Sequence, residues 1–286
     1  MRSMNRFEDD INNICGSADE SQEVEQYDGS LGVSKEFVTT HQKKVGQVQW
    51  NDNLHEIYTD PGNLSGRRWM SGTLLANDYF LSVGHCFDNA SLKPGVEFLP
   101  KVNGTNRYIE SKEIARNMHV NFNYQTDPEG ILRQEDSFPI VELCEFRSRL
   151  VDYALVKLGK NNNNERAGDK YGYARISNND ANLDEIICII GHPKDAHGNT
   201  TKKIAAGKVT LVLGCPVFHK CWIGYNAIDT TPSSSGSGIL RYTNGEVVGI
   251  HVIGECERDR GFNYALKIST LLQASPILNR LYDNGH

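Results

Sequence analysis

The sequence predicts an all-β protein whose strands run antiparallel, as a sandwich or a barrel. Its 286 residues are 38% hydrophobic and 9% aromatic, which is enough apolar material for a globular core. The apolar residues fall into many short runs, and clusters of turn-forming residues separate these runs. This pattern favours antiparallel strands over alternating βαβ units.

The predicted elements follow in order along the chain. Residues 45–50 alternate as a strand does, and residues 70–75 and 79–83 flank the turn residues Asn77 and Asp78, as in a hairpin. Further short apolar runs predict strands at 152–158, 185–190, 208–213, 221–228, 237–241, 247–253 and 262–268. Ser275 and Pro276 make a good N-cap and first helical residue, which predicts a C-terminal helix that ends near Tyr282.

Residues 1–30 carry all of the net charge. They contain eight acidic and two basic residues, which equals the formal net charge of −6 of the whole chain. With few apolar residues and no clear period, they predict a mobile acidic leader or pro-segment over residues 1–40, ahead of a folded domain at 41–286. A solvated terminus without a function explains the same composition.

Composition excludes two classes of partner and indicates a compartment. No run approaches the ~18 apolar residues of a membrane-spanning helix, so we expect no membrane span. A pI near 5.9 without basic clusters argues against nucleic-acid binding. The first 20 residues lack the apolar core of a secretory signal, which predicts a cytoplasmic protein, or a secreted one if an export segment is missing from this sequence.

The seven cysteines form no dense disulfide framework, and their number is odd. Only Cys215 and Cys221 lie close in sequence, with His219 between them. They can form a disulfide or part of a zinc site, but no complete set of four ligands is visible. We therefore expect neither a metal nor a cofactor.

Three segments point to hydrolytic chemistry. The first, 71–86, ends in Ser-Val-Gly-His-Cys with His85; the second, 152–158, begins with Asp152; the third, 229–238, reads DTTPSSSGSG around Ser235. Together they resemble the chymotrypsin-like (trypsin-fold) serine proteases, nearest the bacterial glutamyl endopeptidase-like branch, over roughly 45–281. The resemblance implies two six-stranded antiparallel β-barrels with a catalytic cleft between them, a C-terminal helix, and a serine endopeptidase that acts on proteins or peptides.

A serine hydroxyl needs a neighbouring base to remove its proton, and a histidine performs this task near pH 7. A buried carboxylate then fixes the histidine tautomer. We assign Ser235 as the nucleophile, His85 as the general base and Asp152 as the orienting carboxylate, in the chain order of chymotrypsin. Each segment alone is also common turn or cap chemistry.

Competing bases fit less well. His192 precedes a proline at a predicted strand end, and His41 and His55 lie outside any matching motif.

By resemblance, the backbone amides of Ser233 and Ser235 form the oxyanion hole. Relatives mostly have glycine at the position of Ser233, and glycine tolerates backbone angles that a residue with a Cβ resists. This departure predicts a hole that is strained, or flipped until a substrate or partner arrives. Gly238 stands where the family commonly has proline. Met70 replaces the usual disulfide partner of the counterpart of Cys86, which fits a reducing compartment.

Substrate preference is assigned to four residues by the same resemblance. Thr230 and His251 match the positions that hold a glutamate side chain in glutamyl endopeptidases, and Gly254 directly follows the predicted strand that carries His251. Asp229 lies six residues before Ser235, where trypsin-like enzymes place the acid that selects Lys or Arg. We favour an acidic P1 residue and keep a basic one open, because Asp229 can also face into the barrel and His251 can be a hydrogen-bonded strand residue.

Sixty-six residues separate His85 from Asp152, more than relatives usually carry. The excess is expected in 121–148, either as a docking or specificity element or as a tolerated surface loop. Three functions remain open: an endopeptidase; a catalytically silent binding module of the same fold, favoured by Ser233; and a protease gated by the leader or by an activating protein partner.

Overall fold

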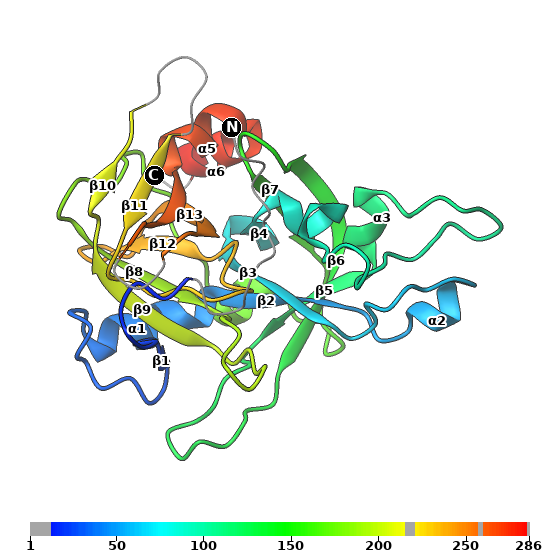
Figure 1. Cartoon of the computed structure of the whole chain (residues 1–286), viewed down its shortest axis with the longest axis horizontal. Helices are drawn as coiled ribbons and strands as arrows, with labels where there is room; N and C mark the ends of the chain where they lie inside the picture. Colours follow the sequence, from blue (N-terminus) through cyan, green and yellow to red (C-terminus); the bar gives the residue numbers. More distant parts are fainter. Residues whose placement is uncertain (1–12, 215–220, 257–259, 285–286) are drawn as a thin grey trace.

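Two β-sheets lie next to each other and make up most of the protein (Figure 1). The computed structural model describes residues 13–214, 221–256 and 260–284. The first sheet is a closed barrel and the second is an open sheet of eight strands. The all-β prediction and the chymotrypsin-like architecture are confirmed, with the second barrel present as a half-barrel.

The first barrel has the strand order β2-β3-β4-β7-β6-β5, and neighbours run antiparallel. Its strands are β2 (Val45–Trp50), β3 (Arg68–Leu75), β4 (Tyr79–Ser82), β5 (Met118–Phe122), β6 (Asp136–Arg147) and β7 (Tyr153–Leu158). The predicted hairpin is present: Leu75 pairs with Tyr79 across a turn in which Asp78 has φ 63°. Because an aspartate tolerates the left-handed region better than most residues, the turn suits this position.

The second sheet has the order β1-β9-β8-β12-β13-β14-β11-β10. Its strands are β1 (Gln22–Glu23), β8 (Ile186–Gly191), β9 (Lys203–Lys208), β10 (Leu211–Val212), β11 (Trp222–Tyr225), β12 (Gly238–Arg241), β13 (Val247–Gly254) and β14 (Asn263–Lys267). β8 is buried on both faces: Ile187 and Ile189 join a small core inside this sheet, whereas Cys188 and Ile190 join the larger core of the protein.

Helices close the ends of the sheets. They are α1 (Lys35–His41), α2 (Leu54–Ile57), α3 (Ser111–Arg116), α4 (Ala167–Tyr171), α5 (Ile268–Ala274) and α6 (Pro276–Asn284), with single 3₁₀ turns at Gln42–Lys44, Ala76–Asp78, Gly84–Phe87 and Asn89–Ser91. The predicted C-terminal helix is α6, and the Ser275 hydroxyl accepts from the Leu278 amide at 3.0 Å, as an N-cap does. Within the described ranges, no helix is long and apolar enough to span a membrane.

The leader is folded onto the protein wherever the structure describes it. Val24, Tyr27, Val33 and Val38 are buried in the larger core, and β1 pairs with β9 as the edge strand of the second sheet. Residues 24–38 are therefore structural, whereas the sequence suggested a mobile tail.

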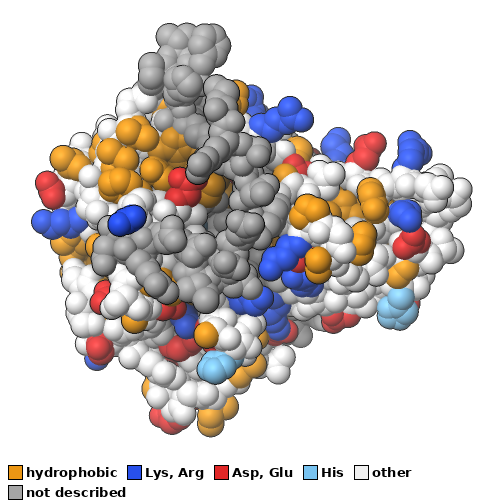
Figure 2. All heavy atoms as spheres, in the orientation of Figure 1, with side chains coloured by type: hydrophobic (Ala, Val, Ile, Leu, Met, Phe, Trp, Pro, Cys, Tyr) orange, Lys and Arg blue, Asp and Glu red, His pale blue; other side chains and the backbone are white. Residues whose placement is uncertain are grey.

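The sequence analysis did not predict the strands β1, β5, β6 and β9 or the helices α1, α2, α3, α4 and α5. Of the segment 121–148, where extra length was expected, residues 136–147 form the barrel strand β6 and residues 123–135 form the loop between β5 and β6. At the other side of the molecule, Figure 2 shows hydrophobic side chains over the end of the second sheet, where Val212 and Leu213 are exposed beside β11.

Candidate active site

The first barrel brings His85 and Asp152 together through the pairing of two neighbouring strands. Ser82 of β4 lies opposite Ala154 of β7, so the residues just beyond these strand ends are adjacent. His85 lies in the 3₁₀ turn Gly84–Phe87 that follows β4. A Cβ on Gly84 would come within 1.8 Å of the Arg147 carbonyl oxygen, so glycine is required for this close approach.

Asp152 holds His85 through two hydrogen bonds. The His85 ring Nδ1 lies 2.5 Å from Asp152 Oδ2, and the His85 backbone amide donates to Asp152 Oδ1 at 2.9 Å. Both residues are buried, with 8% and 2% of their surface exposed. A buried carboxylate that accepts from Nδ1–H fixes the tautomer in which Nε2 is free to accept a proton.

The first barrel also holds the loop that carries Ser235. The Ser71 amide of β3 donates to the Ser235 carbonyl at 3.0 Å, and the Ser71 hydroxyl donates to the Ser233 carbonyl at 2.8 Å. Gly236 has φ 93°, and a Cβ there would lie 2.2 Å from the Ser71 carbonyl oxygen. Only glycine therefore lets the serine loop of the second sheet reach β3 of the first barrel.

The Ser235 hydroxyl donates to the carbonyl of Val252 at 3.2 Å. The residue before Val252, His251, accepts from the Gly236 amide through its own carbonyl at 2.8 Å. Burial first, and then the nearby His85 ring, lower the pKa of His251 to about 3. His85, Ser235 and His251 thus belong to one site, although the hydrogen bonds of the described residues do not include one from Ser235 to His85.

The predicted oxyanion amides lie in an unusual backbone conformation. Ser233 has φ 78°, in the left-handed region, as its departure from glycine led us to expect. The preceding carbonyl, of Pro232, accepts from the Lys194 amide at 2.7 Å, so the Ser233 N–H points to the opposite side of this trans peptide. In the described part of the chain, the amides of Ser233 and Ser235 donate to no protein atom.

His251 and Thr230 are buried polar residues next to this loop. Tyr225 Oη lies 2.5 Å from His251 Nδ1, and this nitrogen is the only hydrogen-bond partner of the phenol among the described residues. The phenol therefore donates, and His251 carries its own proton on Nε2. Thr230 is 2% exposed, and its hydroxyl has no hydrogen-bond partner in the described residues. Such an orphaned group is expected where a ligand supplies the partner.

The carboxylate of Asp229 is bonded to the leader. It accepts from the Cys15 amide at 2.7 Å and from the Glu20 amide at 2.8 Å. Burial raises the pKa of this carboxyl group. Gly254 also contacts the leader, because a Cβ built on it would lie 2.3 Å from Asn13 Cγ.

The competing histidines do not pair with Asp152. His192 is fully buried beside the serine loop: its backbone amide donates to the Ser71 hydroxyl at 2.8 Å, and its ring Nδ1 bonds the Thr200 carbonyl. His41 contacts Phe37 with tilted rings, and His55 is exposed in α2. Of the zinc candidates, Cys215 and His219 lie outside the described residues, and Cys221 is disulfide-bonded. Among the residues described, no group of three or more His, Cys, Asp or Glu side chains could hold a metal ion.

Sequence reasoning missed several residues around the site. The disulfide between Cys15 and Cys256 joins positions 241 residues apart, and no spacing rule indicates it. Tyr225 lies in an apolar run, where a tyrosine is usually a core residue. Ser71 belongs to a quoted motif but carries no signal that it would bind the serine loop.

Comparisons with known proteins bear on the family and the fold of this chain. A family model described as Trypsin matches residues 61–274. Exfoliative toxin A of Staphylococcus aureus is 32% identical over 126 residues, which cover 43% of this chain and 41% of the toxin. The chain therefore matches less than half of the length of that relative.

Solved structures share the fold at low sequence identity. The protease Anisep from Arthrobacter nicotinovorans has a TM-score of 0.53 at 16% identity, covering 85% of this chain and 97% of that protein. A Glu endopeptidase has a TM-score of 0.50 at 17% identity, covering 95% and 99%. Because the Trypsin model spans most of the chain and the fold agrees, this chain belongs to the trypsin family of chymotrypsin-like serine proteases.

Proposed function

We propose that this protein is a serine endopeptidase that cleaves after acidic residues through an acyl-enzyme at Ser235. The observation that carries the proposal is the buried His85–Asp152 pair, in which both carboxylate oxygens bind the same histidine. Because Asp152 occupies Nδ1, the imidazole can accept and return a proton only through Nε2, as a general base and acid does.

The reaction begins with a small movement of Ser235. Its hydroxyl leaves the Val252 carbonyl, at a cost of about 1 kcal/mol for one hydrogen bond, and turns toward His85. His85 takes the hydroxyl proton as Oγ attacks the scissile carbonyl carbon. The amides of Ser233 and Ser235 donate to the oxyanion, and His85 then returns the proton to the leaving amine. A water molecule then attacks the carbonyl carbon of the acyl-enzyme while His85 takes a proton from it. His85 returns this proton to Ser235 Oγ, and the carboxylic acid product leaves.

The pocket favours an acidic P1 side chain. Thr230 offers a buried hydroxyl that has no partner among the described residues. Neutral His251 carries a proton on its ring, which bonds the Tyr264 backbone in this structure and would turn to the carboxylate of the substrate. Both can bind a carboxylate through charge-assisted hydrogen bonds, and the bound charge would raise the pKa of His251. The Asp229 carboxylate, which would select Lys or Arg, already accepts two amides of the leader.

The test compares wild type with Ser235→Ala, using a fluorophosphonate probe and a peptide library. We expect the probe to label the wild type and not the variant, and cleavage in the library, measured with reductant present, to follow glutamate or aspartate. Ser234→Ala is the matched control, since it changes the neighbouring hydroxyl and should leave labelling in place. Failure to label the wild type, with or without reductant, would leave a silent binding module as the better account.

A further inference from the structure

We propose that the leader is a tethered ligand of the specificity pocket, and that the disulfide Cys15–Cys256 is a redox site that controls its release. This inference rests on the proposed function, because the pocket in question is the one that would receive P1. Leader residues touch three of the four residues assigned to specificity: Asp229, Thr230 and Gly254. We call residues 13–15 the leader plug.

The leader plug contacts residues from both segments that are assigned to the specificity pocket. The Thr230 amide donates to the Asn13 carbonyl at 3.3 Å. The Asn13 side chain packs directly against the Cα of Gly254. Asn263 Nδ2 donates to the same Asn13 carbonyl at 3.0 Å. In this proposal, these contacts keep a P1 side chain from reaching Thr230 and Gly254.

The plug is attached covalently to the pocket wall. Cys256, two residues after Gly254, forms the disulfide with Cys15, and both cysteines are buried, at 1% and 3% exposure. A tether this short keeps the plug at a very high effective concentration beside its site, even when its hydrogen bonds open. Residues 17–20 that follow are exposed. A cut there would therefore leave the plug in place, since the disulfide still holds it.

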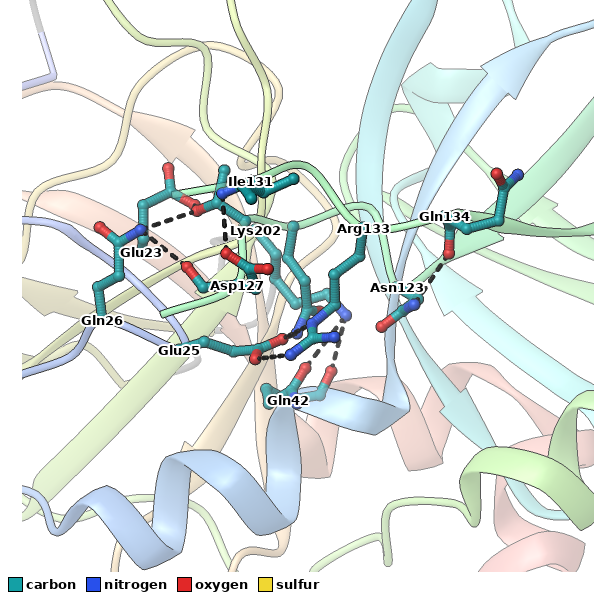
Figure 3. Close-up of polar contacts among 12 residues, drawn as sticks. Glu23, Glu25, Gln26, Gln42, Asn123, Asp127, Ile131, Arg133, Gln134 and Lys202 are labelled. Atoms are coloured by element: carbon teal, nitrogen blue, oxygen red, sulfur yellow. Dashed lines mark hydrogen bonds and ion pairs between the residues drawn. The ribbon is translucent and has the colours of Figure 1, made fainter. Parts of the chain in front are cut away.

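A second attachment lies further along the leader, at residues 22–26, here called the leader arm. Figure 3 shows Glu25 of the arm against Arg133, with two contacts of 2.5 Å, and Gln26 against the Asp127 carbonyl at 3.0 Å. Glu23 accepts from Thr126 at 3.0 Å. The loop 123–135 therefore receives the arm. None of these arm contacts involves the disulfide, so we expect the arm to stay bound after reduction. The released plug then remains close to its site and can bind there again.

Release requires a dithiol reductant. One thiolate of the reductant attacks a sulfur of the Cys15–Cys256 bond, the bond breaks, and the other cysteine leaves as a thiolate that takes up a proton. The second thiol of the reductant then attacks the reductant's own sulfur in the mixed disulfide, and the remaining cysteine leaves as a thiolate that takes up a proton. Two electrons pass from the dithiol to the two cysteines, and the reductant becomes a cyclic disulfide. Because both sulfurs are buried, the attack follows a transient opening of the leader.

The experiment uses the full chain and three readouts: fluorophosphonate labelling of Ser235, hydrolysis of a peptide with glutamate at P1, and hydrogen exchange of segments 228–230 and 252–256. Oxidised wild type is compared with Cys15→Ser and with dithiothreitol-treated wild type. Cys144→Ser, which changes a free and half-buried cysteine, is the matched control. Cys221→Ser tests whether the effect of reductant comes instead from the disulfide of Cys221.

We expect the small probe to label all forms at similar rates, because it needs the catalytic serine and not the pocket. Peptide hydrolysis should rise ~10-fold or more in Cys15→Ser without reductant, and exchange of both segments should become faster. Reductant should activate wild type, Cys144→Ser and Cys221→Ser, and should add nothing to Cys15→Ser.

Equal hydrolysis by oxidised wild type and Cys15→Ser, with labelling intact, overturns the plug and leaves the endopeptidase standing. Unchanged hydrogen exchange in Cys15→Ser overturns the plug regardless of activity. Loss of probe labelling in every form, with faster exchange in Cys15→Ser, supports the plug and overturns the proposed function instead.

Discussion

The two halves of the molecule hold their parts of the site in different ways. In the first barrel, hydrogen bonds run around the whole circle of six strands, and His85 and Asp152 follow directly from the pairing of β4 with β7. In the second sheet the edges are short strands, and the pocket residues are held by the leader and a disulfide. A closed barrel fixes its catalytic side chains by itself, whereas an open sheet needs extra cross-links to keep its loops in place.

We expect the largest loss of activity from Asp152→Asn, which disrupts the His85–Asp152 pair of the first barrel. The amide cannot accept from both the His85 ring and the His85 backbone as the carboxylate does, so the imidazole loses its tautomer and orientation. We expect kcat to fall by ~10⁴ in the leader-released form, as in a related triad. Steady-state kinetics in the Cys15→Ser background measures this effect. A loss below tenfold would show that Asp152 has no orienting role.

Thr230→Val probes the pocket in the second half. It removes a hydroxyl that has no partner in the part of the chain that the structure describes, so little stability should be lost. We expect kcat/KM for a peptide with glutamate at P1 to fall by ~10–100-fold, the cost of one hydrogen bond to a charged group. Thr270→Val is the matched control, since it removes another buried hydroxyl for which the described residues supply no partner. If both variants cleave alike, Thr230 does not bind P1.

Lys202 tests the second half at the point where the leader joins the sheet: it directly precedes β9, and its carbonyl accepts from the Val24 amide. It is buried, its ammonium donates to the Gln42 carbonyl at 3.0 Å (Figure 3), and burial lowers its pKa to about 7. Between pH 7 and 9 the unfolded chain keeps this proton while the folded protein loses it, so stability rises with pH. We expect the free energy of unfolding to gain about 2 kcal/mol over this range.

Denaturant unfolding of wild type and Lys202→Met at both pH values isolates this contribution. The variant should lack the gain, because its side chain does not titrate. Equal pH slopes for the two proteins would show that Lys202 keeps its charge in the folded state.

Ser233→Gly should have the smallest effect. Glycine accepts φ 78° without the crowding that a Cβ causes, at the expense of a more flexible unfolded chain. We expect a net gain of about 0.5–1 kcal/mol in the free energy of unfolding, measured with denaturant. Fluorophosphonate labelling should stay within ~2-fold of wild type if the amides already face the oxyanion. A variant that labels far faster would mean that Ser233 holds the hole in an unproductive form.

The first half of the site was easier to predict from the sequence than the second. His85 and Asp152 lie beside apolar strands, and the resemblance of their segments to a known family assigned both of them, since each segment alone is common turn or cap chemistry. Asp229 shows the limit: its position six residues before Ser235 indicates the pocket, but the direction of its carboxylate depends on Cys15 and Glu20, more than 200 residues away. β6 was overlooked because its outward-facing residues are charged and several are exposed.

The separation of Cys15 from Cys256 also sets the order in which the protein is assembled. During synthesis at ~5–20 residues per second, the second cysteine emerges roughly 10–50 seconds after the first. The first barrel is complete by residue 158, so it can form while Cys15 still waits for its partner. A chain that stops before residue 256 therefore never acquires this covalent restraint on its leader.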